Sequence, residues 1–514
     1  MKYPIGIQNF ESLINDGYLY IDKTALIYQM ASEGRYYFLS RPRRFGKSLL
    51  LSTLEAYFLG KKDLFRGLAI SNLEKDWKVY PVLHLDMNVD NYTSKNVLDN
   101  VLDDYLTRWE KLYCVETKAK SASLRLKNVI IAAYEKTGLP VVMLVDEYDK
   151  PLLQTFNNEK LQDEMRNALK AFYGMLKPLD RYVKFGSFTG VTKFSKVSVF
   201  SDLNNLDDIT MWDDFSTICG ITEREIRENL DNEISEMAVK LGISHEECYT
   251  KLKKQYDGYH FGIESEGVYN PFSLLKALKR KAFGSYWFET GTPTFLMEVM
   301  KQTNYPLDKL NDAIATADLL GSMDSIKDTP IPLLFQSGYL TIKGYDEEFQ
   351  TFHLDFPNDE VNEGLTKFLL PYYSPLSAGS ESFFVSNFVR ELRNGQTEAF
   401  MKRLEALFAD GNYQNIGDAE KYYHNAVYII FKMLGFYVEV EHATTDGRID
   451  LLIKTKDYIY IMEFKINESA EAALQQIEDK QYAKPFEHDE RSIYKIGVNF
   501  STETRRIDDW EISV

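Results

Sequence analysis

The chain is poor in cysteine. Its 514 residues include only three, Cys114, Cys219 and Cys248, which lie far apart in the sequence. This spacing matches no metal-ligand pattern and offers no disulfide framework. We therefore expect cysteine to take no part in metal binding or cross-linking.

Apolar runs of membrane-spanning length are also missing. A transmembrane helix needs about 20 consecutive apolar residues, and no stretch of the chain comes near that length. The first residues, Met1–Pro4, lack the apolar core of a signal peptide. The sequence therefore predicts a cytoplasmic protein without a membrane partner.

Positive charge is in short supply. The chain has 60 lysines and arginines against 77 aspartates and glutamates, which gives a net charge of −17. This negative net charge argues against a protein that binds nucleic acid non-specifically through a basic surface. The composition is otherwise that of a globular protein, with 44% hydrophobic and 27% charged residues. At this length we expect more than one core.

A phosphate-binding loop is predicted near the N-terminus. A β-rich run at 35–40 is followed by a basic loop that ends in Gly-Lys-Ser, and then by a helical pattern at 49–58. Backbone amides of the loop and of the helix start would cradle phosphates. Lys47 would reach the β- and γ-phosphates, and the Ser48 hydroxyl would ligate Mg²⁺. The expected nucleotide-contacting residues are Arg43, Arg44, Phe45, Gly46, Lys47, Ser48 and Leu49.

The loop departs from a standard P-loop at its first position. Arg41 stands where G-x-x-x-x-G-K-S has a glycine, so the loop needs another route to its backbone turn. Arg43 and Arg44 either hold phosphates or a partner, or form a solvated basic loop.

A second nucleotide motif follows about a hundred residues later. An apolar run at 139–147 ends in two acids, of which Asp146 is expected to hold Mg²⁺ through water and Glu147 to orient the attacking water. A run at 182–192 ends in hydroxyls, so Thr189, or Thr192, is expected as a polar sensor beside the γ-phosphate. With a further run at 80–86 and helical stretches between, this region predicts a parallel sheet with its ligand at the strand ends.

Two β-rich runs near the C-terminus carry charges where a buried hairpin should have none. If Lys456 and Asp457 form a two-residue turn, Asp450 faces Glu463 at a Cβ distance of about 4.5–5.5 Å. Lys465 projects from the same side of the sheet because it lies two residues beyond Glu463. Two close carboxylates repel, and a divalent ion such as Mg²⁺ resolves the conflict. A solvated edge hairpin is the plainer alternative.

Helical patterns flank this hairpin. Downstream, Gln476 and Lys480 lie four positions apart on one helical face, from which both are expected to point back at the acids. Upstream, Glu420 and His424 form a similar pair, which is either an addition to the metal site or an ordinary surface pair.

The hairpin resembles the active site of the PD-(D/E)XK nuclease superfamily, with Ile449 in place of the proline of that name. The resemblance implies that Asp450 and Glu463 bind the metal, that Lys465 positions or activates water, and that Gln476 belongs to the site. The segments Asp22–Thr24, 41–48 and 145–149 resemble the bacterial AAA-ATPase-like family, in which a glycine-poor loop and a C-terminal PD-(D/E)XK domain are common. This second resemblance covers nearly the whole chain and implies ATP as the nucleotide.

The middle third shows no catalytic set. A capping box at Thr222–Glu225 begins a helical stretch, and Asp257-Gly258 between aromatic residues signals a hairpin. We expect an α/β architecture in three parts: a P-loop parallel-sheet ATPase domain at 1–221, a mainly helical lid with a winged-helix piece at 222–373, and, after a linker at 374–380, a restriction-endonuclease-like α/β domain at 381–514.

Two functions are compatible with these motifs. In the first, ATP binding or hydrolysis gates a Mg²⁺- or Mn²⁺-dependent phosphodiesterase that cuts DNA or RNA, and the catalytic residues are Glu147, Asp450, Glu463, Lys465 and Gln476. In the second, the chain is a nucleotide-dependent switch or scaffold whose nuclease-like domain binds without cutting. A protein partner or a second copy of the chain fits either function.

Overall fold

The computed structural model describes residues 1–194, 199–200, 202–203, 205–288, 294–303, 305–373, 381–409, 419–435, 439–442, 450–504 and 506–514. The chain forms two compact units, residues 1–303 with 311–361 and residues 304–310 with 362–514. The expected boundaries at 221 and 373 stay predictions, and the expected linker at 374–380 lies outside the described residues. Within these ranges, none of the helices combines the length and the apolar character that a membrane span requires.

A five-stranded parallel sheet forms the centre of the first unit. Its strand order is β2-β3-β4-β1-β5, so β4 lies between β1 and β3. All side chains of β1 and β3 are buried, as in strands that are covered on both faces. The four predicted strands are confirmed, and the sheet consists of β1 (Tyr36–Ser40), β2 (Val82–Asp86), β3 (Val141–Asp146), β4 (Val183–Gly190) and β5 (Leu206–Asp208).

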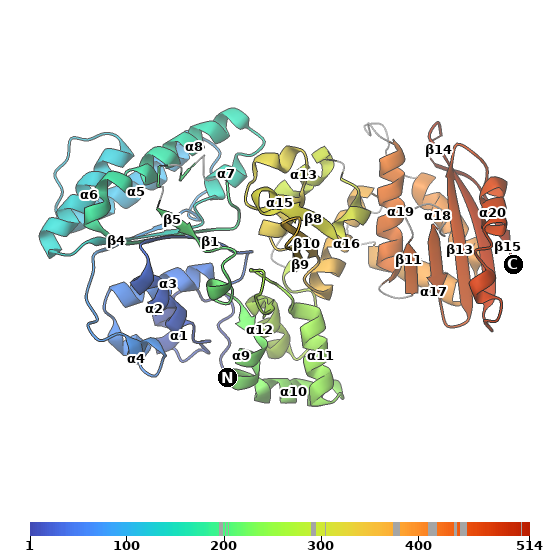
Figure 1. Cartoon of the computed structure of the whole chain (residues 1–514), viewed down its shortest axis with the longest axis horizontal. Coiled ribbons are helices and arrows are strands. Elements are labelled where there is room, and N and C mark those ends of the chain that lie inside the picture. Colours follow the sequence, from blue (N-terminus) through green and yellow to red (C-terminus); the bar gives the residue numbers. More distant parts are fainter. Residues whose placement is uncertain are drawn as a thin grey trace. The chain divides into compact units, whose positions relative to one another are not determined.

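Helices cover both faces of this sheet (Figure 1). The face that carries α3 also carries α1, α2 and α4, and the other face carries α5, α6 and α8. Parallel strands of one sheet are usually connected by helices that cross over a face of the sheet in this way. The bounds are α1 (Phe10–Asn15), α2 (Thr24–Glu33), α3 (Lys47–Phe58), α4 (Ile70–Leu73), α5 (Lys95–Tyr113), α6 (Ala122–Thr137), α7 (Lys150–Gln154) and α8 (Glu159–Gly174).

A helical group follows the sheet in the sequence. Thr222 caps its first helix through the predicted capping box with Glu225, and Ile234, Leu252 and Leu274 belong to its apolar core. The group contains α9 (Glu223–Asn229), α10 (Asp231–Leu241), α11 (His245–Tyr256) and α12 (Pro271–Arg280), with the antiparallel pair β6 (Ile221–Thr222) and β7 (Val268–Tyr269).

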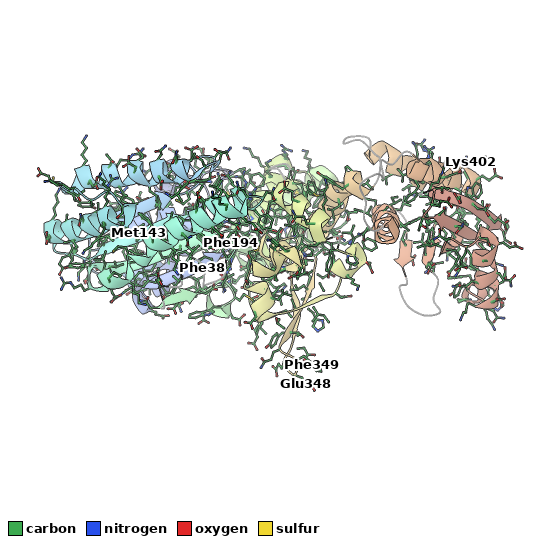
Figure 2. The ribbon with its side chains drawn as sticks, turned by 90° about the horizontal axis from the view of Figure 1, so that it is seen from above. Phe38, Met143, Phe194, Glu348, Phe349 and Lys402 are labelled. Atoms are coloured by element: carbon green, nitrogen blue, oxygen red, sulfur yellow. The ribbon has the colours of Figure 1, made fainter. Side chains whose placement is uncertain are left out.

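The rest of the first unit has the chain order of a winged helix. Strand β10 pairs antiparallel with both β8 and β9, and Glu348 and Phe349 stand at the tip of the β9–β10 hairpin (Figure 2). Helix α15, by contrast, is buried throughout, unlike a helix that enters the major groove of DNA. The elements are α13 (Thr294–Thr303), β8 (Ala313–Thr316), α14 (Ala317–Leu320), α15 (Ile331–Gln336), β9 (Thr341–Asp346) and β10 (Thr351–Asp355).

A mixed five-stranded sheet, in the order β11-β12-β13-β14-β15, forms the centre of the second unit. Only β13 and β14 are parallel among its neighbouring pairs. Helix α20 connects these two strands and packs on them, while α17, α18 and α19 lie on the other side of the sheet (Figure 1). The bounds are α16 (Asp359–Tyr373), α17 (Glu381–Arg393), α18 (Thr397–Ala409), α19 (Ala419–Gly435), α20 (Ala470–Asp479), β11 (Glu439–His442), β12 (Leu451–Lys454), β13 (Tyr458–Ile466), β14 (Ser492–Ser501) and β15 (Arg506–Ser513).

Candidate nucleotide and metal sites

The predicted phosphate loop lies between β1, which ends at Ser40, and α3, which begins at Lys47. Two of its residues have positive φ, Arg44 at 69° and Gly46 at 94°. Glycine adopts such angles at little cost. The loop therefore makes its left-handed turns at these two residues and not at Arg41, where a standard P-loop has its first glycine.

Arg41 holds the start of the loop by its side chain. The residue is fully buried, and its guanidinium donates to the backbone oxygens of Ser40, Thr210 and Phe215 at 3.0, 2.7 and 3.2 Å. It also lies 4.1 Å from the centroid of the Phe261 ring. Burial lowers the pKa of Arg41 to about 10, so the group is charged at neutral pH. These contacts fix the chain where glycine would otherwise be needed.

Lys47 lines a cavity of about 460 Å³. Its ammonium donates to the backbone oxygens of Arg41 and Pro42 at 2.9 and 3.2 Å. Phe45 differs from the other loop residues because its ring packs against Tyr259, 4.8 Å away, and leaves only its backbone for a phosphate. The other predicted residues that line the cavity are Arg43, Arg44, Gly46, Ser48, Leu49 and Glu147.

The acids predicted at the end of β3 lie next to this cavity. Glu147 lines it and has a φ of 51°. Asp146 is buried and accepts hydrogen bonds from the Thr189 hydroxyl at 2.6 Å and from the Glu147 amide at 3.0 Å. The structure thus brings Asp146 and Thr189 together, whereas Thr192, the other predicted sensor, bonds to a different acid.

That acid is Asp149, whose role the sequence motifs do not indicate. Its Oδ2 accepts from the Val191 amide at 3.0 Å, the Thr192 amide at 2.6 Å and the Thr192 hydroxyl at 2.7 Å. Burial, and then the Glu147 carboxylate, raise the pKa of Asp149 to about 6. A Cβ on Gly190 would lie 2.7 Å from Asp149 Oδ1. The glycine that ends β4 and an acid two positions after Glu147 are the sequence signals for this contact.

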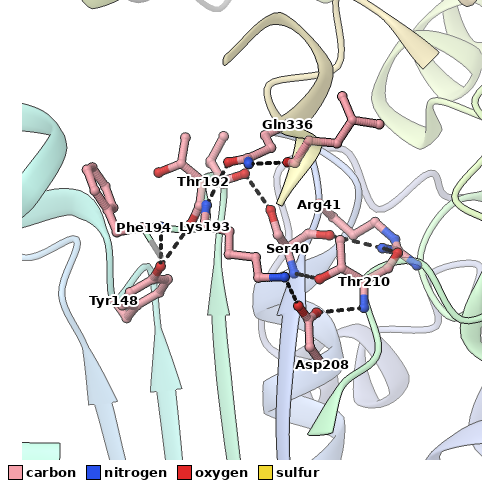
Figure 3. A network of polar contacts seen from close by, with 11 residues as sticks. Ser40, Arg41, Tyr148, Thr192, Lys193, Phe194, Asp208, Thr210 and Gln336 are labelled. Carbon is pink, nitrogen blue, oxygen red and sulfur yellow. Dashed lines mark hydrogen bonds and ion pairs between the residues drawn. The ribbon is translucent and has the colours of Figure 1, made fainter. Parts of the chain in front are cut away.

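A polar network connects the segment after β4 with α15 (Figure 3). Gln336 accepts from the Lys193 amide at 2.7 Å and donates to the Leu320 carbonyl at 2.7 Å. The Lys193 ammonium forms an ion pair with Asp208. The network also contains Ser40, Arg41, Tyr148, Thr192, Phe194 and Thr210. The start of the phosphate loop, the end of β4 and the winged-helix region are therefore joined by hydrogen bonds.

The C-terminal hairpin has the predicted register. Leu451 pairs with Met462, so the next pair along the strands is Asp450 and Glu463. Residues 456–457 form the predicted two-residue turn, closed by a 2.8 Å backbone hydrogen bond between its flanking residues. The predicted pairing of the two acids across the hairpin is therefore confirmed.

Glu463 is the buried centre of this site, with a side chain that is 2% exposed. Its Oε1 accepts from Gln476 Nε2, while its buried Oε2 has no partner among the described residues. Gln476 Oε1 in turn accepts from Lys465 Nζ at 2.7 Å. Asp450 Oδ2 accepts from the Phe464 amide at 3.0 Å. Gln476 thus joins Glu463 to Lys465, with the Asp450 carboxylate alongside.

The donor set fits a hard divalent cation. Burial, and then the Asp450 carboxylate, raise the pKa of Glu463 to about 7, and a cation between the two acids would relieve both effects. In the part of the chain that the structure describes, no cluster of three or more His, Cys, Asp or Glu side chains could hold a metal. Two carboxylates with waters and phosphate oxygens suffice for Mg²⁺. Asp450 and Glu463 are therefore the residues that could hold it.

The remaining predictions for this site have different outcomes. Lys480 is exposed at the end of α20 and, within the ranges described, makes no hydrogen bond to Glu463 or Lys465. Within the described residues the structure therefore shows no contact between Lys480 and the acids, although Lys480, as the C-cap residue of α20, keeps an αR backbone. Residue Ile449 and the side chains of Glu420 and His424 lie outside the described residues.

Replacing Glu463 by glutamine is expected to stabilise the metal-free fold at pH 8. The folded-state pKa of about 7 exceeds the ordinary 4.5, so the folded chain holds this proton more tightly than the unfolded chain does. The stabilisation is fully present below pH 4.5 and is lost as the pH rises through 7. Ionisation of the group therefore lowers the free energy of unfolding by about 3 kcal/mol at pH 8, a loss that a neutral amide avoids. Thermal melts in EDTA should show a higher melting temperature for Glu463→Gln at pH 8 and a smaller difference at pH 5. An equal difference at both pH values, or none, contradicts the expectation; Asp457→Asn, in the exposed turn, is the control.

Comparisons with known proteins find relatives for both ends of the chain. A family model described as "Predicted AAA-ATPase" matches residues 4–200, and one described as "PD-(D/E)XK nuclease superfamily" matches residues 418–510. An uncharacterized protein in the vnfD 5′ region of Azotobacter chroococcum mcd 1 is 36% identical over 517 residues, which cover 98% of each of the two chains. The matched segments contain the phosphate loop, β3 and β4 at one end and the acidic hairpin with α20 at the other.

Proposed function

Because the chain belongs to the predicted AAA-ATPase family and ends in a PD-(D/E)XK nuclease superfamily domain, we propose that it hydrolyses ATP and that ATP gates a metal-dependent phosphodiesterase acting on DNA or RNA. One observation carries the proposal. The buried Glu463 keeps a bare carboxylate oxygen beside Asp450, with Lys465 fixed next to them by Gln476.

At the nucleotide site, the backbone amides of residues 43–49 would receive the phosphates and Lys47 would neutralise the β- and γ-groups. Ser48 and Asp146 would hold Mg²⁺, which offsets phosphate charge when bound. Glu147 would accept a hydrogen bond from the attacking water. Thr189 supports this arrangement because its hydroxyl fixes the Asp146 carboxylate at 2.6 Å.

At the C-terminal site, Asp450 and Glu463 would hold Mg²⁺ or Mn²⁺, which when bound polarises a phosphodiester and lowers the pKa of a bound water. Lys465 offers its ammonium to that water or to a phosphate oxygen. Gln476 orients both Glu463 and Lys465, since its Nε2 donates to the Glu463 carboxylate and its Oε1 accepts from the Lys465 ammonium. This set of groups suits hydrolysis of a phosphodiester.

A second function, a nucleotide-dependent switch or scaffold that binds without cutting, is favoured by the net charge of −17. An acidic chain gains little from the counterion release that drives tight nucleic-acid binding. A protein partner or a second copy of the chain then receives the signal. Both functions are compatible with the cytoplasmic location that the sequence predicts.

The test is a cleavage assay on the full chain with single- and double-stranded DNA and RNA. We expect cleavage of at least one substrate class with Mg²⁺ or Mn²⁺, none with EDTA, and a rate that changes when ATP is added. Metal-dependent cleavage at the same rate with and without ATP would refute the proposal that ATP gates the nuclease. Absence of cutting across the whole panel, while ATP is hydrolysed, would leave the scaffold as the function.

A further inference from the structure

Lys150 is a basic residue of the nucleotide cavity that neither the P-loop nor the acids of β3 account for. It is the first residue of α7, three positions after Glu147, and it lines the same cavity as Lys47, Ser48 and Glu147. We propose that the Lys150 ammonium contacts the γ-phosphate and stabilises its charge during ATP hydrolysis. This inference rests on the proposed ATPase function.

The backbone of Lys150 is fixed by the turn that follows β3. Glu147 has a φ of 51°, and its carbonyl accepts from the Lys150 amide at 3.0 Å. Asp149, immediately before Lys150, is buried and accepts three hydrogen bonds from Val191 and Thr192. Lys150 therefore starts from an anchored position and extends into the cavity from the side of Glu147.

The contacts of Lys150 leave its charge available. The residue is half-buried, and its ammonium donates to Asn88 Oδ1, a neutral amide oxygen, in an exposed hydrogen bond. Asn88 lines the same cavity. No carboxylate forms an ion pair with Lys150 in the described residues. Asn88 follows the end of β2, where its backbone N–H donates to Asp86 Oδ1 at 2.8 Å. An ammonium has three donors, so this single bond leaves two for phosphate oxygens.

The other cations of the cavity occupy different positions. Lys47 lies over the phosphate loop, next to the carbonyls of Arg41 and Pro42. Arg44 is exposed and lies 5.1 Å from the centroid of the Phe272 ring. Arg43, which also lines the cavity, is exposed and belongs to the phosphate loop itself. Lys150 belongs instead to the turn that follows Glu147, on the side from which the attacking water would approach. A terminal phosphate between Lys47 and Lys150 would be contacted from two directions.

The reaction assigned to this site is the hydrolysis of ATP. The water oxygen bonds to the γ-phosphorus, the bond from that phosphorus to the β–γ bridging oxygen breaks, and its electron pair stays on ADP. The water proton passes to Glu147 or to the released phosphate. Lys150 gives up no proton; it donates hydrogen bonds to the γ-oxygens, on which charge is spread in the transition state. A cation in this place does what an arginine from a neighbouring molecule does in other ATPases.

The test compares Lys150→Met, Lys150→Arg and the control Lys160→Met, which changes an exposed lysine of α8. Calorimetry should give Lys150→Met an ATP affinity about 10-fold below wild type and an ADP affinity within about twofold, because ADP lacks the γ-phosphate. The kcat for ATP hydrolysis should fall about 100-fold in Lys150→Met, recover in part in Lys150→Arg, and stay unchanged in Lys160→Met.

Equal losses of ATP and ADP affinity, or a kcat within about twofold of wild type, would overturn the inference. If Lys150→Met does not fold, Lys150→Gln serves the same comparison, since it can still bond Asn88 but carries no charge. A wild-type chain that neither binds nor hydrolyses ATP is a different result, which would refute the proposed ATPase function itself.

Discussion

The Asp450→Asn variant is expected to lose metal-dependent phosphodiester cleavage by about 10³-fold, the order of effect for removing one electrostatic group from an active site. Asparagine keeps the shape of the side chain. It also keeps an oxygen that can accept the 3.0 Å hydrogen bond that the Phe464 amide donates to Asp450. It removes the negative charge that faces Glu463 across the hairpin. Glu463 would then be the one carboxylate that holds the cation. The Lys465 ammonium could not take over the work of the metal ion.

The matched control is Asp457→Asn, which makes the same chemical change in the exposed turn of the same hairpin. Cleavage by Asp457→Asn should equal that of wild type, and both variants should bind ATP normally. Cleavage by Asp450→Asn at more than about a tenth of the wild-type rate would show that Asp450 is not a metal ligand.

The second large effect is expected from Lys47→Met. A charge-assisted hydrogen bond to phosphate contributes about 1.5–3 kcal/mol, so ATP affinity should fall about 10- to 100-fold. The measurement is calorimetric titration with ATP, and the control is Lys62→Met, which changes an exposed lysine beyond the end of α3. If ATP gates the nuclease, Lys47→Met should also lose the ATP dependence of cleavage while it keeps cleavage with metal alone.

Equal ATP affinity in wild type and Lys47→Met would remove the P-loop assignment. If ATP affinity falls as expected but the ATP concentration that changes cleavage stays the same as in wild type, nucleotide instead acts at another site. The two readouts therefore separate binding from gating.

The hairpin site could be predicted from the sequence because its geometry is local. A two-residue turn fixes which residues face each other, and a period of two fixes the side from which they project. Asp450, Glu463 and Lys465 therefore followed from counting. Gln476 followed from helical spacing, whereas Lys480 is exposed and, within the described residues, makes no hydrogen bond to the acids.

The contacts that shape the nucleotide site could not be predicted, because they join distant parts of the chain. Arg41 reaches a carbonyl 169 positions away, Asp149 a threonine 43 positions away, and Gln336 an amide 143 positions away. Local patterns identify the loop and the acids of β3 but contain no information on these partners. The substitution of Arg41 for glycine is therefore explained only by the fold, which buries the guanidinium among carbonyl groups.

The raised pKa of Glu463 shows how stability and function are linked at the second site. Its side chain is buried beside a second carboxylate, an arrangement that disfavours the charged form without a cation. Metal binding should therefore release a proton near neutral pH and stabilise the fold. The bare Glu463 Oε2 is the structural mark of this arrangement.

The central claim is that Asp450 and Glu463 share one divalent cation, and anomalous diffraction from crystals of the full chain soaked in Mn²⁺ tests it most directly. The account predicts one strong anomalous peak coordinated by a carboxylate oxygen of each residue, with Glu463 Oε2 among the ligands. A Mn²⁺-soaked crystal with no peak between these two carboxylates, or with Mn²⁺ bound to only one of them, would contradict it.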